Sequence, residues 1–392
     1  MKILLYGVMT EDNFGGPSLI HGVRQLIRKL DEDADIICYQ PTKIKEIAVS
    51  DMDIPVYQMP YKGARLLLDG LKYKFGIRPK NERCLMFLDH IKTADIVADL
   101  FGICFCEHFF PKKIGRFKAI KSVIGKFSVS FLARLYKRKT VKCPASYGPI
   151  LSKGLKIQAR YAAKHIFDIM YARENESKTQ MQNAGVRNVL TSPDLANMMP
   201  YDTPVNRQFI GISVSYQIIN QWRSDETYIE CMDKLIRYIL ETTDLSVELI
   251  PNEIVETNDY NDIHVANDIH ERFDHSERVA IADVKNMSST QIKSLIAGSE
   301  AFIGSRYHAC VASLSSGVPT LIVGWHYKYD ELLHWYGQDQ WIISNNNCSS
   351  ERLIEMFKSF WDNHNNEREV IKAKLPQVWD ALLESGKVMF SK

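Results

Sequence analysis

Two consecutive series of short apolar runs, each run followed by a stretch with helical spacing, constrain the fold of this chain more than any other feature. The first series predicts strands at residues 2–8, 36–39, 96–102, 141–147 and 168–173, and helices at 19–30, 156–167 and 177–184. Strands that alternate with helices form parallel sheets with helices on both faces. The first half of the chain therefore predicts one doubly wound α/β domain.

The alternation stops at residues 199–206, a polar stretch with two prolines, and then begins again. The second series predicts strands at 209–214, 247–250, 279–281, 301–303, 319–323 and 341–343, and helices at 225–241, 289–297, 306–316, 330–336 and 351–363. We therefore predict two Rossmann-like domains, residues 1–203 and 204–367, that face each other across a cleft. A final helical stretch within residues 368–392 could return to the first domain and complete it.

Length and composition agree with this organisation and exclude several classes of protein. With 392 residues, 45% of them hydrophobic, the chain can form two or three domains with substantial cores. No stretch reaches the roughly 20 apolar residues of a membrane-spanning helix. The apolar start at residues 1–7 is too short for a signal peptide, and acidic and polar residues follow it at once. We expect a cytoplasmic protein.

The eight cysteines are scattered along the chain, without a CxxC pair. Cys104 and Cys106 alternate along an expected strand, so both side chains would point to the same face and could bind a metal. Reduced cysteines that pack as small hydrophobic side chains are the more common outcome in such a protein. We therefore expect reduced cysteines and no metal site.

Charge is divided unevenly along the chain, although the formal net charge is only +2. Residues 1–200 hold 32 basic and 19 acidic side chains, whereas residues 201–392 hold 17 basic and 28 acidic ones. This split predicts an acidic partner near the first half of the chain.

The sharpest candidate site is the segment 302–309, where an apolar strand is expected to end at Gly304 and a helix to begin near Ser305. Free N–H groups and the helix dipole favour an anion at such a helix N-terminus. Arg306 adds a planar fork for phosphate or carboxylate, and His308 can exchange protons near neutral pH. We predict Arg306 and His308 as catalytic residues and Tyr307 as a substrate contact. The alternative is a surface arginine beside a histidine whose ring bonds neighbouring backbone.

Other candidate substrate contacts lie in loops that follow the expected strands. They are Asn13, Gly15, Gly16, Ser146, Arg173, His326 and Lys328. The two glycines would let the backbone of the first loop approach a ligand, but the loop is not GxGxxG and predicts no dinucleotide. Lys328 would bind an anion and His326 an acceptor. Each position also has a structural explanation, as a plain turn or an ion pair at the end of a strand.

The basic segment, residues 112–142, holds eleven Lys and Arg and no acid, interleaved with apolar residues at roughly helical spacing. Such a segment can lie on an anionic membrane surface, where each basic side chain contributes about 1 kcal/mol. Attraction to nucleic-acid phosphates has the same signature. A solvated helix face packed on its domain is the structural alternative. Between the two partners we favour the membrane surface, and we expect no nucleic acid.

The order of these motifs resembles the polysaccharide pyruvyl transferase family. The corresponding segments are Asn13-Phe14-Gly15-Gly16, Leu100-Phe101-Gly102, Ser146-Tyr147-Gly148-Pro149, Arg173-Glu174 with Ser177, Pro193-Asp194-Leu195-Ala196, Gly304-Ser305-Arg306-Tyr307-His308-Ala309, Gly317-Val318-Pro319 and Lys328. The resemblance extends from residue 1 to about residue 337, and the block around Arg306 and His308 is its most specific part. Two departures, Gly16-Pro17-Ser18 and Phe101, concern the acceptor more than the donor.

The resemblance implies a fold similar to that of GT-B glycosyltransferases, with the acceptor on the first domain and the donor on the second. It implies transfer of a pyruvyl group from phosphoenolpyruvate to two hydroxyls of one sugar, with formation of a cyclic ketal and release of phosphate. The setting would be the biosynthesis of a cell-surface polysaccharide, such as a capsule or exopolysaccharide. Phosphoenolpyruvate would be the donor substrate, without a cofactor. A lipid-linked saccharide is the expected acceptor, which would place the enzyme peripherally at the inner face of the plasma membrane.

On this interpretation Arg306, Arg173 and Lys328 bind the phosphate and carboxylate of the donor, and His308 is the general acid that protonates its methylene carbon. Two other classes stay open. One is a GT-B glycosyltransferase that holds the diphosphate of a nucleotide sugar with Arg306 and Lys328. The other is a non-catalytic member of the family that binds a glycan.

Overall fold

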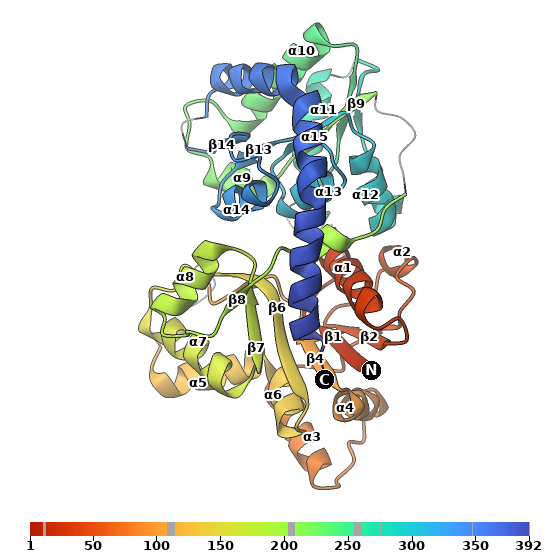
Figure 1. The fold of residues 1–392 in the computed structure, drawn as a ribbon, viewed down its shortest axis with the longest axis vertical. Coiled ribbons are helices and arrows are strands. Elements are labelled where there is room, and N and C mark those ends of the chain that lie inside the picture. Colours follow the sequence, from red (N-terminus) through yellow and green to blue (C-terminus); the bar gives the residue numbers. More distant parts are fainter. Residues whose placement is uncertain are drawn as a thin grey trace.

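Two parallel β-sheets, one above the other in Figure 1, form the framework of the computed structural model. The structure describes residues 1–10, 13–107, 114–202, 208–254, 261–273, 276–346 and 348–391. The first sheet comes from the first half of the chain and the second sheet from the second half. Two doubly wound α/β units are therefore confirmed. The predicted boundary between residues 203 and 204 lies outside the described residues.

The first sheet has the strand order β3-β2-β1-β4-β6-β7-β8, with β5 paired to β6, and these pairings are parallel. Its strands are β1 (Lys2–Tyr6), β2 (Asp35–Gln40), β3 (Val56–Gln58), β4 (Ile96–Asp99), β5 (Ile103–Cys104), β6 (Lys139–Tyr147), β7 (Ile169–Ala172) and β8 (Leu190–Thr191). Its helices are α1 (Gly15–Leu30), α2 (Glu46–Val49), α3 (Ala64–Lys74), α4 (Glu82–Thr93), α5 (Arg116–Lys126), α6 (Ser128–Leu135), α7 (Lys153–His165) and α8 (Asn175–Asn183). The strand order reverses between β1 and β4, so the loops after these strands open a crevice.

The second sheet has the order β11-β10-β9-β12-β13-β14, again with parallel pairings. Its strands are β9 (Phe209–Ser213), β10 (Ser246–Leu249), β11 (Val279–Ile281), β12 (Ala301–Gly304), β13 (Thr320–Gly324) and β14 (Ile342–Ser344). Its helices are α9 (Tyr216–Gln221), α10 (Tyr228–Thr242), α11 (Asp262–His270), α12 (Ser289–Ala297), α13 (Tyr307–Ser315) and α14 (Lys328–Trp335). The order reverses between β9 and β12, which places a second crevice at the carboxyl ends of these strands.

One helix of 40 residues, α15 (Ser350–Met389), runs along both units (Figure 1). The sequence predicts a helix at 351–363 and a separate helical stretch within residues 368–392, and the structure corrects these to one helix. The polar residues between the two predicted helices have distant partners. Glu367 accepts a hydrogen bond from Gln338 Nε2 at 2.7 Å, and Arg368 Nη2 donates to Glu300 Oε1 at 2.8 Å. Because the partners are far along the chain, helical periodicity alone does not reveal them.

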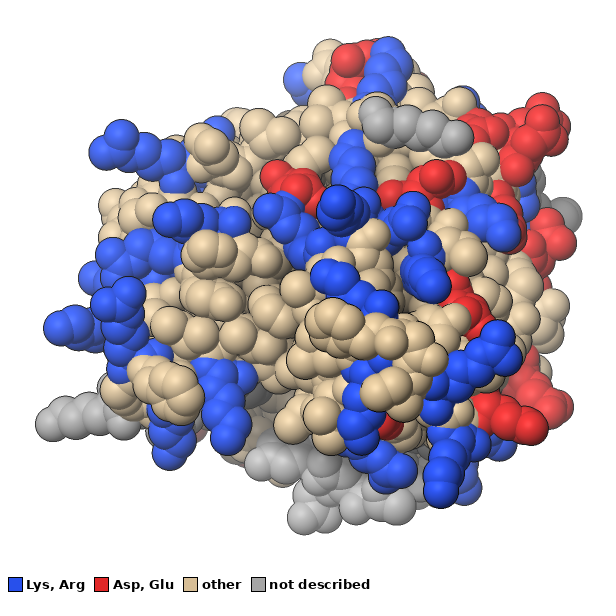
Figure 2. Space-filling model, turned by 90° about the horizontal axis from the view of Figure 1, so that it is seen from below, with Lys and Arg blue, Asp and Glu red and all other residues tan. Residues whose placement is uncertain are grey.

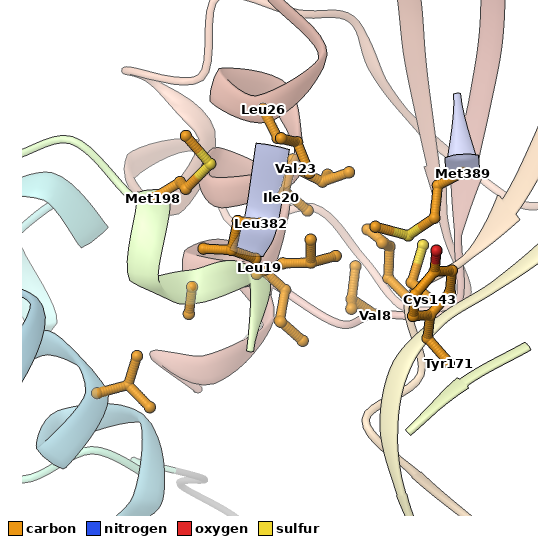
Figure 3. Packing of buried hydrophobic residues seen from close by; sticks show 14 of the residues in the cluster. Val8, Leu19, Ile20, Val23, Leu26, Cys143, Tyr171, Met198, Leu382 and Met389 are labelled. Atoms are coloured by element: carbon orange, nitrogen blue, oxygen red, sulfur yellow. The ribbon is translucent and has the colours of Figure 1, made fainter. Parts of the chain in front are cut away.

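The last turns of α15 pack against the first sheet. The Tyr171 hydroxyl donates to the Ser385 carbonyl at 3.4 Å, and Lys139 Nζ donates to the Val388 carbonyl at 3.0 Å. Figure 3 shows Leu382 among the side chains of α1, and Met389 beside Cys143 and Tyr171. The core of the first unit is thus completed by the last turns of α15.

Between residues 41 and 95 the sequence predicts no element, yet the structure has β3 and the helices α2, α3 and α4 there. The helix α4 buries Cys84, Phe87, Leu88 and Ile91 at helical spacing, so its apolar stripe is present in the sequence. For α2 and α3 burial explains the difference, because α3 buries only Leu66 and Gly70, and α2 buries none of its residues. Helices that bury so little have no continuous apolar stripe for a periodicity argument to detect. Among the described residues, no helix is both long and apolar enough to cross a membrane.

Candidate active site

A cavity of about 540 Å³ lies between the carboxyl ends of the two sheets. Its lining comes from the loops after β1, β4, β7, β10, β12 and β13. Eight of the ten predicted site residues line it: Asn13, Gly15, Gly16, Arg173, Arg306, Tyr307, His308 and Lys328. Ser146 and His326 are not among the lining residues. The structure thus brings together residues that are up to about three hundred positions apart in the sequence.

Arg306 lies at the N-terminus of α13, where the sequence predicts it, but its guanidinium is already paired. Nε and Nη2 donate to the two carboxylate oxygens of Asp262 at 2.8 and 2.5 Å, and Nη1 lies 2.6 Å from Glu253 Oε2. Burial opposes its charge, but the two carboxylates raise the pKa of Arg306 above its usual value. Three of its five N–H groups are occupied, which leaves two for a ligand.

Arg173 follows β7 and is also neutralised. Its Nε donates to Ser146 Oγ at 2.9 Å and to Glu174 Oε1 at 2.8 Å, and its Nη1 donates to Asp194 Oδ2 at 2.7 Å. Its guanidinium lies 4.3 Å from the ring centre of Tyr307. Ser146 is buried beneath the arginine, which is why it does not reach the cavity. The structure therefore gives Ser146 the role of a support for Arg173.

Lys328 lines the cavity and forms no ion pair with a carboxylate of the described residues. Its Nζ lies 4.7 Å from the ring centre of Trp325, 5.3 Å from Tyr329 and 5.4 Å from Tyr307. No hydrogen-bond acceptor for this Nζ is found in the part of the chain that the structure describes. Burial, with a smaller contribution from Arg173, lowers the pKa of Lys328 to about 7.

His308, on the first turn of α13, faces both a carboxylate and the first loop. Its Nε2 is 4.0 Å from Asp194 Oδ2 and makes no hydrogen bond with the described residues. The pKa of His308 is lowered to about 4, mainly by burial. The positive charges of Arg173 and Lys328 also lower this pKa, whereas the Asp194 carboxylate raises it. The imidazole is therefore neutral at pH 7 in the unliganded cavity. A side chain at Gly15 would place its Cβ 2.4 Å from His308 Nδ1, so glycine is required there.

The first loop joins the two halves of the site. Asn13 Oδ1 accepts hydrogen bonds from Gly15 N at 2.6 Å and Gly16 N at 3.3 Å, which satisfies free N–H groups at the start of α1. Phe14 N donates to Asn252 O in the second unit at 3.1 Å, beside a bridge between Asn13 and Glu253. Asn13 therefore orders the loop and ties it to the second unit.

His326 lies at the start of α14, and its Nδ1 accepts a hydrogen bond from Lys328 N at 3.3 Å. Its ring lies against that of Tyr327, tilted by 40°, with 4.1 Å between the ring centres. This bond holds the imidazole against the helix. The sequence predicts His326 as an acceptor contact, but His326 is not among the residues that line the cavity. His326 instead helps to fix the first turn that carries Lys328.

The wall formed by the first unit is largely apolar. Phe101, Ile103 and Phe105 line it, and Lys126 Nζ lies 5.2 Å from the ring centre of Phe101. The predicted strand 96–102 ends early, at Asp99, because the Asp99 carboxylate accepts a hydrogen bond from Phe101 N at 2.8 Å and turns the chain. Cys106 consequently lies outside β5, and the predicted strand alternation of Cys104 and Cys106 does not occur.

Four carboxylates that the sequence does not single out as ligands of the arginines complete the site: Glu174, Asp194, Glu253 and Asp262. Glu174 and Asp194 lie in motifs quoted for the family resemblance. Glu253 and Asp262 follow β10, and no motif marks them. The four carboxylates carry two more charges than the two arginines, so the paired arginines add no net positive charge to the site. Lys328 and the α13 N-terminus therefore supply the attraction for an anion on this wall.

All eight cysteines are buried, and none of them forms a disulfide. Within the described ranges, no three His, Cys, Asp or Glu side chains lie close enough together to hold a metal ion.

The basic segment packs most of its apolar side chains inward. Val123, Phe127 and Leu132 are buried, and the last cation, Lys142, lies 3.0 Å from Asp99 Oδ1 in a buried ion pair. Lys112 and Lys113 lie outside the described residues. This packing agrees with the alternative of a solvated helix face. Membrane contact by the segment stays a prediction.

Solved structures with the same architecture define the class of fold. MnaA from S. aureus, in a structure with UDP, has a TM-score of 0.58 and 12% identity over 96% of this chain and 92% of its own. HepE from Anabaena, in complex with UDP, has a TM-score of 0.54 and 13% identity over 99% and 98%. A glycosyltransferase from Rickettsia africae has a TM-score of 0.55 and 11% identity over 100% and 99%. The fold is that of the GT-B glycosyltransferases and epimerases.

The sequence itself identifies the family within that fold. A family profile described as "Polysaccharide pyruvyl transferase" matches residues 13–327, which is most of the chain. The chain therefore belongs to the polysaccharide pyruvyl transferase family, a class of enzymes. Among curated proteins, none matches the chain in sequence.

Proposed function

We propose that this enzyme transfers the enolpyruvyl group of phosphoenolpyruvate to two hydroxyls of one sugar, forming a cyclic pyruvate ketal and releasing phosphate. The observation that carries the proposal is the grouping of Lys328, His308 and the N-terminus of α13 in one cavity of a family member. This grouping combines an anion site with a proton-transfer residue. Phosphoenolpyruvate needs both, because it carries two anionic groups and reacts by protonation.

The donor binds on the wall of the second unit. Its phosphate meets Lys328 and the free N–H groups at the start of α13, and its carboxylate takes the remaining N–H groups of Arg306 or Arg173. The carboxylates behind each arginine keep both guanidinium groups charged and fixed in direction. The aromatic rings around Lys328 hold its ammonium group in place without neutralising it.

The reaction proceeds by proton transfer and two additions. A proton from His308 adds to the methylene carbon, which becomes a methyl group, and the neighbouring carbon acquires oxocarbenium character. One sugar hydroxyl adds to that carbon and loses its proton. The C–O bond to phosphate then breaks, and the second hydroxyl adds and loses its proton to close the ring. The methylene carbon takes up one proton, and the two hydroxyls together release two. The departing phosphate and basic groups of the cavity accept the two released protons. The scheme proposes no cofactor.

His308 can act as the acid only after the donor has bound. In the unliganded cavity its pKa is about 4, so it is neutral at pH 7. Negative charge placed beside the imidazole favours its protonated form. A donor bound next to His308 therefore raises the pKa of His308. The protonated imidazole can then transfer its proton to the methylene carbon of the donor.

The acceptor binds on the wall of the first unit. Phe101 and Ile103 offer apolar surface to the faces of a sugar ring, and Lys126 stands beside them. A lipid-linked saccharide of a cell-surface polysaccharide, such as a capsule or exopolysaccharide, fits a wall that combines apolar surface with a cation. Such an acceptor places the enzyme at the inner face of the plasma membrane, without a nucleic-acid partner.

Mass spectrometry of candidate acceptors incubated with phosphoenolpyruvate tests the proposal. We expect an adduct of one pyruvate ketal and one phosphate released for each acceptor modified. Release of a nucleoside diphosphate from a nucleotide sugar, with none of this adduct, would instead identify a GT-B glycosyltransferase. Glycan binding with no turnover of either donor would identify a non-catalytic member.

A further inference from the structure

Four large apolar side chains are exposed within ten residues at the end of α3. The exposed fractions are 54% for Leu68, 40% for Leu71, 79% for Phe75 and 60% for Ile77. Single exposed apolar residues are normal on a protein surface, but a contiguous group of them marks an interaction site. We call residues 65–80 the α3 tip.

The α3 tip is also strongly basic. Arg65, Lys72, Lys74, Arg78 and Lys80 are all exposed, and the one acid within residues 65–80 is Asp69. Asp69 accepts a hydrogen bond from the Tyr61 hydroxyl. Figure 2 looks at this end of the molecule from below and shows Lys and Arg spread over it, with Asp and Glu gathered mainly toward one edge. The apolar group therefore lies among five exposed cations and a single acid.

The opposite side of α3 holds the helix on the domain. A Cβ at Gly70 would lie 2.6 Å from Leu132 Cδ2 of α6, and the Tyr136 hydroxyl donates to the Gly70 carbonyl at 2.7 Å. Gly76, with φ of +88°, reverses the chain after the helix. The tip is thus a fixed projection, and its apolar side chains are not part of the core.

We propose that the α3 tip docks on an anionic phospholipid bilayer. A helix with apolar side chains ringed by Lys and Arg binds at a lipid interface, where burial of the apolar groups and attraction to anionic headgroups add together. A protein partner would also have to be acidic across the whole tip. The membrane supplies that charge and an apolar interior at once.

The position of the α3 tip is compatible with catalysis. Tyr136, which contacts α3, precedes the first residue of β6, whereas the cavity lies at the carboxyl ends of the strands. Figure 1 shows α3 at the end of the molecule remote from the second sheet. Docking there leaves the cavity open. This surface deepens the membrane location included in the proposed function and assigns it to residues other than 112–142.

Sedimentation with vesicles tests the surface directly. The full chain should bind vesicles made of equal parts phosphatidylglycerol and phosphatidylcholine. It should bind vesicles of phosphatidylcholine alone much more weakly. The double variant Phe75→Ser/Ile77→Ser should bind the anionic vesicles at least about tenfold more weakly. The variant Lys72→Gln/Lys74→Gln/Arg78→Gln/Lys80→Gln should lose about 10²-fold or more at low salt. Leu151→Ser, which removes an apolar side chain that is 70% exposed outside the tip, is the matched control and should bind normally.

Several results would overturn the proposal. They are undiminished binding by both tip variants, equal binding to neutral and anionic vesicles, and loss of binding only in Phe117→Ser/Lys118→Gln/Lys121→Gln on α5. A dimer of the full chain that the Phe75→Ser/Ile77→Ser variant dissociates would show that a second copy covers the tip.

Phosphate release with a water-soluble acceptor keeps the two proposals apart. The tip variants should retain this activity, which also shows that they are folded. Vesicle binding without any phosphate release would remove the proposed reaction and leave the membrane surface standing. Phosphate release without vesicle binding would do the reverse.

Discussion

At the scale of single residues, the close approach of Gly15 to His308 makes a sharp test of the site. Gly15→Ala would force the imidazole away from its position, since the added Cβ would lie 2.4 Å from Nδ1. We expect it to lower kcat with little change in thermal stability. His308→Ala should lower kcat by roughly 10²–10⁴-fold.

Gly125→Ala on α5 is the matched control, because a Cβ there meets nothing within 4 Å. It should leave kcat unchanged in assays of phosphate release. Full activity in Gly15→Ala and His308→Ala would exclude His308 from the reaction.

The pKa of Lys328 should determine how kcat/KM for phosphoenolpyruvate depends on pH. Its pKa is about 7 because the ammonium is buried, so it is charged below that pH and loses its charge above it. The value of kcat/KM for phosphoenolpyruvate should therefore fall as the pH rises through about 7. Lys328→Arg keeps its charge across this range and should flatten that part of the profile. Parallel pH profiles for the two proteins would contradict this role.

Arg306 is held by a network whose loss we expect to destabilise the fold. Asp262 accepts hydrogen bonds from Arg306, and from Tyr216 N at 2.9 Å and Glu253 N at 2.9 Å. Asp262→Asn removes a buried charge partner and should cost about 3–5 kcal/mol of unfolding free energy. Denaturant unfolding measures this loss, with the exposed Asp283→Asn as control. Arg306→Ala should lower stability as well as donor affinity, since it leaves two carboxylates unpaired.

The sequence could predict most of the charged residues that line the cavity, but not the side chains with which they pair. Arg173, Arg306, His308 and Lys328 all follow strands, and parallel strands bring their carboxyl ends to one edge. The pairing of Arg306 with Asp262 depends on how loops after β10 and β12 fold toward each other. No spacing in the chain encodes that contact. The same holds for Ser146, whose burial beneath Arg173 only the packed structure reveals.

At the scale of secondary structure, α12 anchors the connection between the two units. Lys293 on this helix is 1% exposed, and its Nζ donates to the Met199 carbonyl at 2.7 Å. Burial lowers the pKa of Lys293 to about 7, below the ordinary lysine value of about 10.4. The unfolded chain therefore binds more protons than the folded one between these two values. The contribution of Lys293 to stability rises with pH across that window.

Lys293→Met removes this pH-dependent contribution. Relative to the natural protein, the stability of the variant should fall by up to about 1.4 kcal/mol per pH unit as the pH rises from about 7 toward 10. Thermal unfolding at pH 6, 8 and 9.5 measures the trend. Lys285→Met, at an exposed site on the same unit, should show no such slope. An unchanged difference across the range would mean that Lys293 keeps its charge when buried.

Predictability of most elements follows the depth of their burial, and α4, which is well buried but not predicted, is an exception. The central strands β1, β4, β9 and β12 are continuous apolar runs because helices cover both faces, and the sequence predicts all four. Short or exposed elements such as β8, whose residues are both exposed, carry no such pattern and go undetected. The helix α15 is the opposite case. Its halves are visible in the sequence, but their continuity depends on distant partners of Glu367 and Arg368.

At the scale of the whole molecule, α15 makes the stability of the first unit depend on residues that follow the second unit in the sequence. Leu382 is fully buried in the core shown in Figure 3, so Leu382→Ala should cost about 2–5 kcal/mol. Val388→Ala, on the same helix but 44% exposed, should cost much less. Urea unfolding followed by tyrosine fluorescence measures both. Equal stability of the two variants would show that α15 only lies on the surface of the first unit.

The arrangement of α15 also separates the order of synthesis from the order of folding. The residues of the first sheet leave the ribosome early, but their core lacks Leu382 and Met389 until the second unit has also been translated. The Tyr171 hydroxyl donates to the carbonyl of Ser385, which is synthesised 214 residues later. Domains at the start of a chain usually fold as they emerge. Here the second unit can fold first, and the nascent first unit keeps an uncovered apolar face until α15 has been synthesised.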